Sequence, residues 1–154
     1  LINALGKVLK LRLYEELREK RGDVYGVRVS PFATDAPYEW YRIGIEYSTD
    51  PEVAKELLDI IFDKIENLKT EGPLAEDVVK VKEALLLNVE EGMDYNSYWT
   101  NELKEMVEYD RDPESILKYK ESIDKITAEK IQEAAKKYFN MDNYGRFILY
   151  PKKQ

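Results

Sequence analysis

The chain has 154 residues, of which 44% are hydrophobic and 36% charged, a balance typical of a globular domain with a charged surface. Its net charge of −7 gives little electrostatic support for binding nucleic acid or an anionic membrane, and no apolar run approaches the roughly 20 residues of a membrane span. The sequence contains no cysteine, which excludes disulfides and metal sites with thiolate ligands. It also contains no histidine, the commonest zinc ligand and the usual general base near neutral pH.

The first predicted element is a helix over residues 1–20. Its apolar stripe at helical spacing comprises Leu1, Leu5, Val8, Leu9 and Leu13. Leu11 and Tyr14 lie on the other side, so the helix is expected to be covered on two faces, and partial exposure of those faces favours self-association. Gly22 predicts the end of the helix, because glycine tolerates the left-handed conformation found there.

A β-hairpin is predicted next, with strands over residues 24–32 and 38–48 joined by the turn "ATDAP". Both segments alternate between the two faces of a sheet, and Tyr25 is expected to begin the first strand on the same face as Val27 and Val29. The short connection makes the pair antiparallel.

The rest of the chain is predicted to be helical up to a last strand. The expected helices run from Pro51 to the segment "TEGP", then over residues 74–92, 97–109, 113–122 and 127–138, with Thr127 as a capping residue, and a strand covers residues 145–150. A lone strand is not stable, so this last strand is expected to pair with the hairpin. The sequence thus predicts an α+β fold of two layers, a small antiparallel sheet of hairpin and C-terminal strand packed against a layer of helices.

The domain organisation follows from the absence of linkers, repeats and low-complexity segments, which predicts one domain over residues 1–154. Because Leu1 is not methionine and the chain begins inside a helical pattern with no capping residue, we expect an excised C-terminal subdomain of a larger protein. The compartment stays open between the bacterial periplasm and the cytoplasm.

No self-sufficient active site or metal-binding motif is found, but the stretch "LREKRGDVYGVRVS" places Arg18 at a helix end and Tyr25 after the turn. A guanidinium and a phenol both donate hydrogen bonds, so the pair could hold a substrate carbonyl and stabilise the oxyanion formed on attack by water. The alternative reading is structural, with Arg18 on a solvated helix face and Tyr25 a packing residue. Arg21 is interpreted as a solvated turn residue.

Four stretches follow each other along the chain: "NALGKVLKLRLYEELREKRGDVYGVRVS", "YRIGIEYSTDPEVAKELLDIIFDKIENLKTEGPLAEDVVKVKEAL", "NSYWTNEL" and "SIDKITAEKIQEAAKKYFNMDNYGRFILYP". In this order they resemble the C-terminal, non-zinc half of the pitrilysin/insulinase (M16) zinc metallopeptidases, most of all the bacterial long-chain members. The resemblance implies that Arg18 and Tyr25 bind the substrate backbone near the scissile carbonyl. It also implies that zinc is bound by an H-x-x-E-H motif in an N-terminal half, which is absent here, so this chain alone is expected to be inactive and to bind no metal.

The implied partners are the zinc-binding half, in the same protein or in a partner chain, and a peptide substrate that pairs with the edge of the hairpin. Two alternatives remain open. The chain could belong to a non-catalytic processing or scaffold subunit of the same fold, or it could be an interaction module unrelated to proteolysis.

Overall fold

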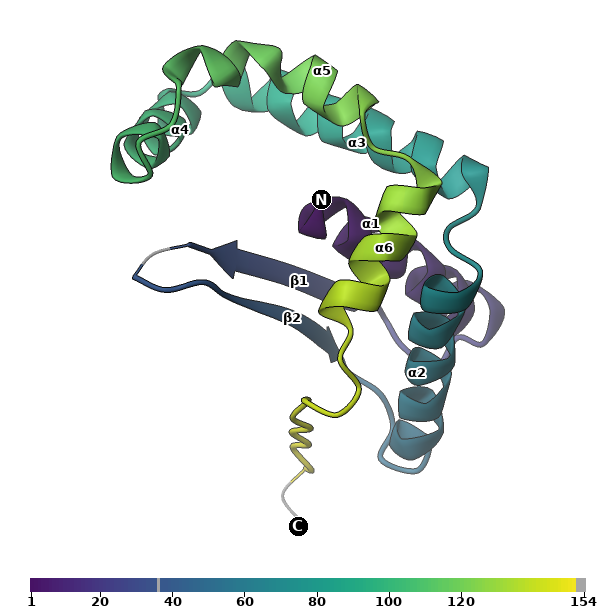
Figure 1. Ribbon diagram of the computed structural model, residues 1–154. Coiled ribbons are helices and arrows are strands. Elements are labelled where there is room, and N and C mark those ends of the chain that lie inside the picture. Colours follow the sequence, from purple (N-terminus) through teal and green to yellow (C-terminus); the bar gives the residue numbers. More distant parts are fainter. Residues whose placement is uncertain (36, 152–154) are drawn as a thin grey trace.

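The computed structural model describes residues 1–35 and 37–151 (Figure 1). Strands β1 (Val27–Thr34) and β2 (Trp40–Tyr47) form an antiparallel two-stranded sheet, and the rest of the regular structure is helical. The helices are α1 (Ile2–Leu13), the π-helix η1 (Tyr14–Lys20), α2 (Ala54–Thr70), α3 (Ala75–Met93), α4 (Asn96–Glu108), the 3₁₀-helix η2 (Pro113–Lys118), α5 (Tyr119–Asp124) and α6 (Ala128–Tyr138). The α+β class expected from the sequence is confirmed.

Helix α1 lies at the centre of the core and contacts β1, α2, α3 and α6. Leu5, Leu9 and Leu13 recur every fourth residue and are completely buried, and Leu17 continues the series into η1. Four stacked leucines on one stripe bury apolar surface against several neighbours, which stabilises the domain more than helix propensity does. Figure 1 shows α3 and α5 running side by side above α1 and α6.

The helix predicted over residues 1–20 is present, but its last seven residues form a π-helix, which no local pattern in the sequence indicates. Short π-helical segments are uncommon and are often found at functional sites. Gly22 ends the helix with a φ of +72°, as its position predicted. Its N–H donates to the Arg18 carbonyl at 3.1 Å, and the next N–H, from Asp23, reaches the Leu17 carbonyl at 3.0 Å.

The hairpin is confirmed as antiparallel, with Val27 opposite Tyr47 and Thr34 opposite Trp40. The expected start of its first strand was wrong, because β1 begins at Val27 and Tyr25 lies in the preceding loop. The reason is tertiary: beyond Tyr47 the chain turns toward α2, and the Thr49 hydroxyl donates to the Asp23 carbonyl at 2.7 Å in place of a strand pair.

The predicted C-terminal strand was wrong, because residues 145–150 form no strand and the sheet has two strands in the part of the chain that is described. Side chains on both sides of the segment face solvent, with Phe147 94% and Leu149 99% exposed on one side and Tyr150 65% exposed on the other. Tyr144 packs edge-on against Phe62 of α2, with 5.2 Å between the ring centroids. This contact holds the start of the segment near α2, and Figure 1 shows the chain leading away from the sheet beyond the end of β2.

Other helix boundaries differ in detail from the expectation. Helix α2 begins at Ala54 instead of Pro51, because residues 51–53 form a turn closed by the Val53 N–H on the Asp50 carbonyl at 3.2 Å. The single helix expected over residues 113–122 is divided into η2 and α5. Thr127 is confirmed as the cap of α6, where its hydroxyl accepts the Lys130 N–H at 3.3 Å.

Helix α1 approaches its neighbours closely. A Cβ added to Gly6 would lie 2.7 Å from the Pro31 ring of β1, so only glycine allows this crossing. On the side facing α3, the Arg12 guanidinium donates to the Asp77 carboxylate at 3.0 Å and to the Gly72 carbonyl at 3.3 Å. Asp77 is the buried charged residue of the core, and Arg12 supplies its counter-ion.

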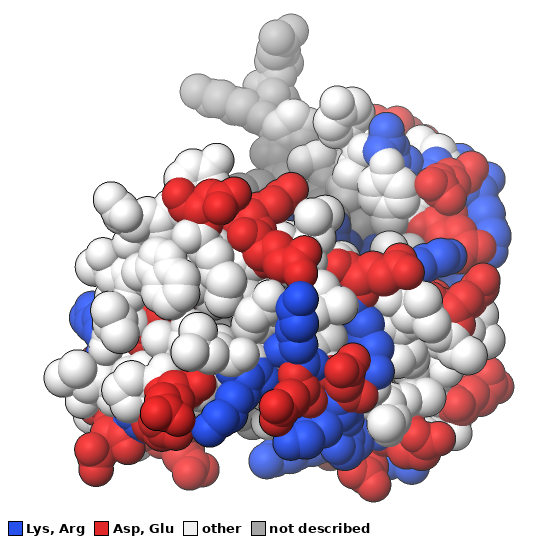
Figure 2. Space-filling model, turned by 90° about the horizontal axis from the view of Figure 1, so that it is seen from above, with Lys and Arg blue, Asp and Glu red and all other residues white. Residues whose placement is uncertain are grey.

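The surface carries both signs of charge. Figure 2 shows acidic and basic side chains interspersed with uncharged surface on the face seen from above. None of the helices described is long and apolar enough to cross a membrane.

Candidate functional site

The two residues singled out from the sequence, Arg18 and Tyr25, both point into solvent. Each follows a buried aliphatic residue, Leu17 in η1 and Val24 in the loop before β1. Because the aliphatic neighbour is anchored in the core, the next side chain is directed outward in each case. Tyr25 is 91% exposed, so this tyrosine is not part of the core of the chain.

The structure brings these two side chains together. The Arg18 guanidinium carbon lies 5.7 Å from the centre of the Tyr25 ring and 4.8 Å from the centre of the Tyr14 ring. Cations within about 6 Å of an aromatic ring face are attracted by its quadrupole, so Arg18 is held by two tyrosines. Tyr14 is half-buried and packs against the core, which makes it the fixed member of the trio.

The turn between Arg18 and Tyr25 is fixed by ion pairs. Arg21 donates to Asp23 and to Glu56 of α2, both at 2.6 Å. These hydrogen bonds, the one to Asp23 more than the one to Glu56, raise the pKa of Arg21 above its usual value, so the guanidinium stays charged. Arg21 is therefore more than the solvated turn residue expected from the sequence, since it ties the turn to α2.

The π-helix itself is also anchored to α2. Lys64 donates to the Glu16 carboxylate at 2.8 Å, and this hydrogen bond is the main cause that holds the pKa of Glu16 below its usual value. Lys20 pairs with Glu15 at 2.8 Å on the outer side. In this way η1 is attached to the domain around the exposed Arg18.

The polar groups of Arg18 and Tyr25 remain available for a ligand. Neither side chain makes a hydrogen bond or ion pair with the described residues of the chain. The site offers hydrogen-bond donors and positive charge, and it contains no nucleophile and no general acid–base pair. It can therefore bind and polarise a carbonyl or carboxylate oxygen, but it cannot by itself cleave a bond.

The residues of this chain do not fit a zinc site. The sequence has no histidine or cysteine, and no group of three or more aspartates and glutamates within residues 1–35 and 37–151 is placed to hold a metal ion. Carboxylates alone are poor ligands for zinc in proteins, so a catalytic zinc would need ligands from outside this chain.

Comparison with known proteins identifies the family. The family described as the Peptidase M16 inactive domain matches residues 1–85, which contain the whole Arg18–Tyr25 region. The chain belongs to this family. The resemblance found in the sequence is thereby confirmed, and the chain is a C-terminal domain of the M16 zinc protease family, of the type described as inactive.

Relatives of this M16 domain are much longer than the chain. A "Zinc protease PQQL-like" of Arabidopsis thaliana is 32% identical over 107 residues, a match that covers 66% of the chain and 11% of the plant protein. A crystal structure of a peptidase M16 inactive domain from Pseudomonas fluorescens superposes with a TM-score of 0.77, 22% identity and coverage of 92% of this chain and 34% of that one. The crystal structure of the periplasmic protease PqqL from Escherichia coli superposes with a TM-score of 0.69 and 17% identity. This match covers 88% of this chain and 15% of PqqL. The two crystal structures establish the fold.

Tyr14 is the residue that sequence reasoning missed at this site. The signal was present, because Tyr14 and Arg18 are four residues apart, a spacing that places side chains next to each other on a helix. The sequence pattern alone places Tyr14 only on a second covered face of the helix. Its contact with Arg18 shows that one aromatic ring both packs on the core and supports an exposed cation.

Proposed function

We propose that this M16 domain positions peptide substrate for a larger zinc metallopeptidase, whose zinc is held outside residues 1–154. Arg18 and Tyr25 would bind the substrate backbone beside the scissile carbonyl. The observation that carries this proposal is the pair of exposed donors held together on an anchored scaffold, with no hydrogen-bond or ion-pair partner in the described chain. A protein surface that exposes a tyrosine over an arginine in this way is suited to a ligand rich in carbonyl oxygens.

The edge of the sheet supports the same proposal. In the described structure β1 pairs with β2 on one side and with no other strand, so its second edge has free backbone donors and acceptors near Val27. A peptide added there as a further strand gains backbone hydrogen bonds that do not depend on its sequence. Tyr25 lies two residues before this edge begins, which places the donor pair at the end of such a peptide.

The complete protein is proposed to be a single chain or a pair of chains in which this domain faces a zinc-binding half. The curated and structural relatives support this through their length, since the match covers 11% of the plant protein and 15% of PqqL. Within the larger protein, residues 1–154 are proposed to form one domain.

Arg18→Leu in the complete protein tests the proposal. Loss of a charged hydrogen-bond donor to substrate is expected to lower kcat/KM for a fluorogenic peptide by roughly 10- to 100-fold. Arg42→Leu is the matched control, because Arg42 is an exposed arginine on β2, the strand away from the free edge of β1, with no ion pair in the described chain, and its substitution is expected to change kcat/KM less than twofold. Equal rates for both variants, or a wild-type protein without zinc, would favour the processing or scaffold subunit instead.

Tyr14 is expected to act through Arg18. Tyr14→Phe keeps the ring under the guanidinium and should retain wild-type kcat/KM, whereas Tyr14→Leu keeps the apolar bulk and should lower kcat/KM about fivefold. Thermal denaturation of both variants checks the fold. A Tyr14→Phe variant as impaired as Tyr14→Leu would show that the hydroxyl matters and that the stacking explanation is wrong.

A further inference from the structure

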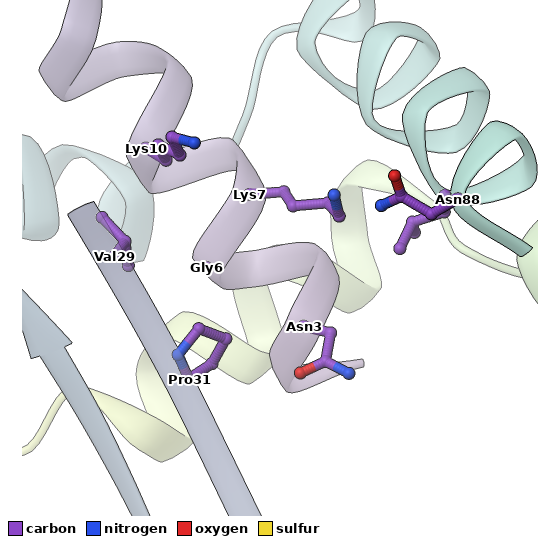
Figure 3. Close-up of a pocket in the computed structure, with 8 residues that line it drawn as sticks. Asn3, Gly6, Lys7, Lys10, Val29, Pro31 and Asn88 are labelled. Atoms are coloured by element: carbon purple, nitrogen blue, oxygen red, sulfur yellow. The ribbon is translucent and has the colours of Figure 1, made fainter. Parts of the chain in front are cut away.

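A groove with a basic side lies between α1, β1 and α3, toward the opposite end of α1 from Arg18 (Figure 3). Its volume is about 390 Å³. Lys7 and Lys10 of α1 line it together with Asn88 of α3, and Figure 3 shows the Lys7 and Asn88 side chains pointing toward each other. Ammonium groups and amide nitrogens are hydrogen-bond donors, so the groove offers donors to an anion.

The two lysines of the groove lack counter-ions among the residues that the structure describes. Residues 1–14 contain Lys7, Lys10 and Arg12 but no aspartate or glutamate, and Arg12 is used by Asp77. Neither lysine forms an ion pair with any residue of the described chain. In a sequence with 31 acidic and 24 basic residues, where carboxylates are plentiful, two lysines in one groove without a carboxylate indicate a site for an external anion.

The groove lies on the same side of the helix as the donor pair. Lys10, Tyr14 and Arg18 follow each other at intervals of four residues, so their side chains form one row, and Lys7 begins that row three residues earlier. At the α-helical rise of 1.5 Å per residue the separation between Lys10 and Arg18 would be about 12 Å, and the π-helix over Tyr14–Lys20 makes it somewhat shorter along the axis.

Strand β1 gives a matching length. Val29 and Pro31 of β1 form the apolar wall of the groove, and Pro31 is four residues after Val27, where the free edge begins. Four residues of strand span about 13 Å at 3.3 Å each. A peptide that lies along β1 with its scissile carbonyl at Tyr25 would therefore reach the groove with its fourth or fifth residue.

We infer that this groove binds the carboxylate of a glutamate or aspartate of the peptide substrate, about four residues from the scissile bond. The inference rests on the proposed function and adds a substrate class to it. Lys7, Lys10 and Asn88 receive the carboxylate, and the wall of Val29 and Pro31 contacts the methylene groups of the side chain. The contribution is that of partly exposed ion pairs, so it sets preference among peptides without being required for cleavage.

The test is a set of paired peptides cleaved by the complete protein. Each pair carries glutamate or glutamine at one position, from two to six residues on either side of the scissile bond. We expect one position about four residues away at which glutamate lowers KM roughly fivefold relative to glutamine, with kcat unchanged. Lys7→Gln with Lys10→Gln should abolish this preference, and Lys7→Glu with Lys10→Glu should reverse it in favour of a peptide that carries lysine.

The controls separate the inference from the proposed function and from folding. Lys55→Gln with Lys136→Gln removes the same charge at two exposed lysines outside the groove and should keep the preference, as should Lys7→Arg with Lys10→Arg. A wild-type protein with no position that favours glutamate, or a preference that survives Lys7→Gln with Lys10→Gln, overturns the inference. If Arg18→Leu and Tyr25→Phe leave cleavage unchanged, the proposed function itself fails.

Discussion

Tyr25→Phe in the complete protein is expected to lower kcat for peptide cleavage about 10²-fold, the usual loss when one donor to a developing oxyanion is removed. Phenylalanine keeps the exposed ring beside the Arg18 guanidinium and removes only the hydroxyl. That hydroxyl has no hydrogen-bond partner in the described chain and Tyr25 is 91% exposed, so the thermal denaturation midpoint should not change. Steady-state kinetics with a fluorogenic peptide measure the effect.

Tyr38→Phe is the matched control for this result. Tyr38 is 69% exposed in the loop of the hairpin, and its substitution removes the same hydroxyl away from Arg18. We expect wild-type kcat for this variant. If Tyr25→Phe retained full activity and instead lowered the denaturation midpoint, Tyr25 would be a structural residue and would have no part in binding substrate.

Asp77→Ala is expected to lower the free energy of unfolding by about 3 kcal/mol, because a guanidinium that is only 15% exposed loses its counter-ion. Asp77 is 7% exposed and accepts the Arg12 hydrogen bond at 3.0 Å. The same carboxylate accepts the Leu74 N–H at 3.3 Å just before α3, so the substitution also removes a helix cap. Urea denaturation followed by circular dichroism measures the change.

An exposed ion pair of the same kind provides the comparison. Arg111 donates to Asp35 at 3.1 Å, but their side chains are 45% and 64% exposed, and Asp35→Ala is expected to cost less than about 0.5 kcal/mol. The double variant Arg12→Leu with Asp77→Leu should recover part of the loss, since two apolar side chains replace a buried pair. Equal losses for Asp77→Ala and Asp35→Ala would show that burial does not strengthen the Arg12–Asp77 pair.

Much of the architecture could be predicted from local patterns. The leucine series of α1, the alternation of the hairpin and the cap at Thr127 depend on side-chain directions that are fixed within a few residues. The proximity of Arg18 and Tyr25 was also accessible, because a helix end, a glycine turn and the approach to a strand place the two residues at one edge. The family resemblance then supplied the role that we propose for them.

The remaining features depend on contacts between distant segments. Residues 145–150 do not pair as a strand, and Tyr144 just before them packs on Phe62, more than 80 residues away in the chain. The Arg12–Asp77 pair and the groove of Lys7 and Lys10 likewise bring together separate elements, and the π-helix that carries Arg18 is joined to α2 by the Lys64–Glu16 pair. The sequence by itself determined where most helices and the hairpin lie and which side of each is apolar, since the spacing of apolar residues reflects the direction of their side chains. Only the tertiary structure decided which segments meet, because pairing depends on the free energy of the whole packed domain.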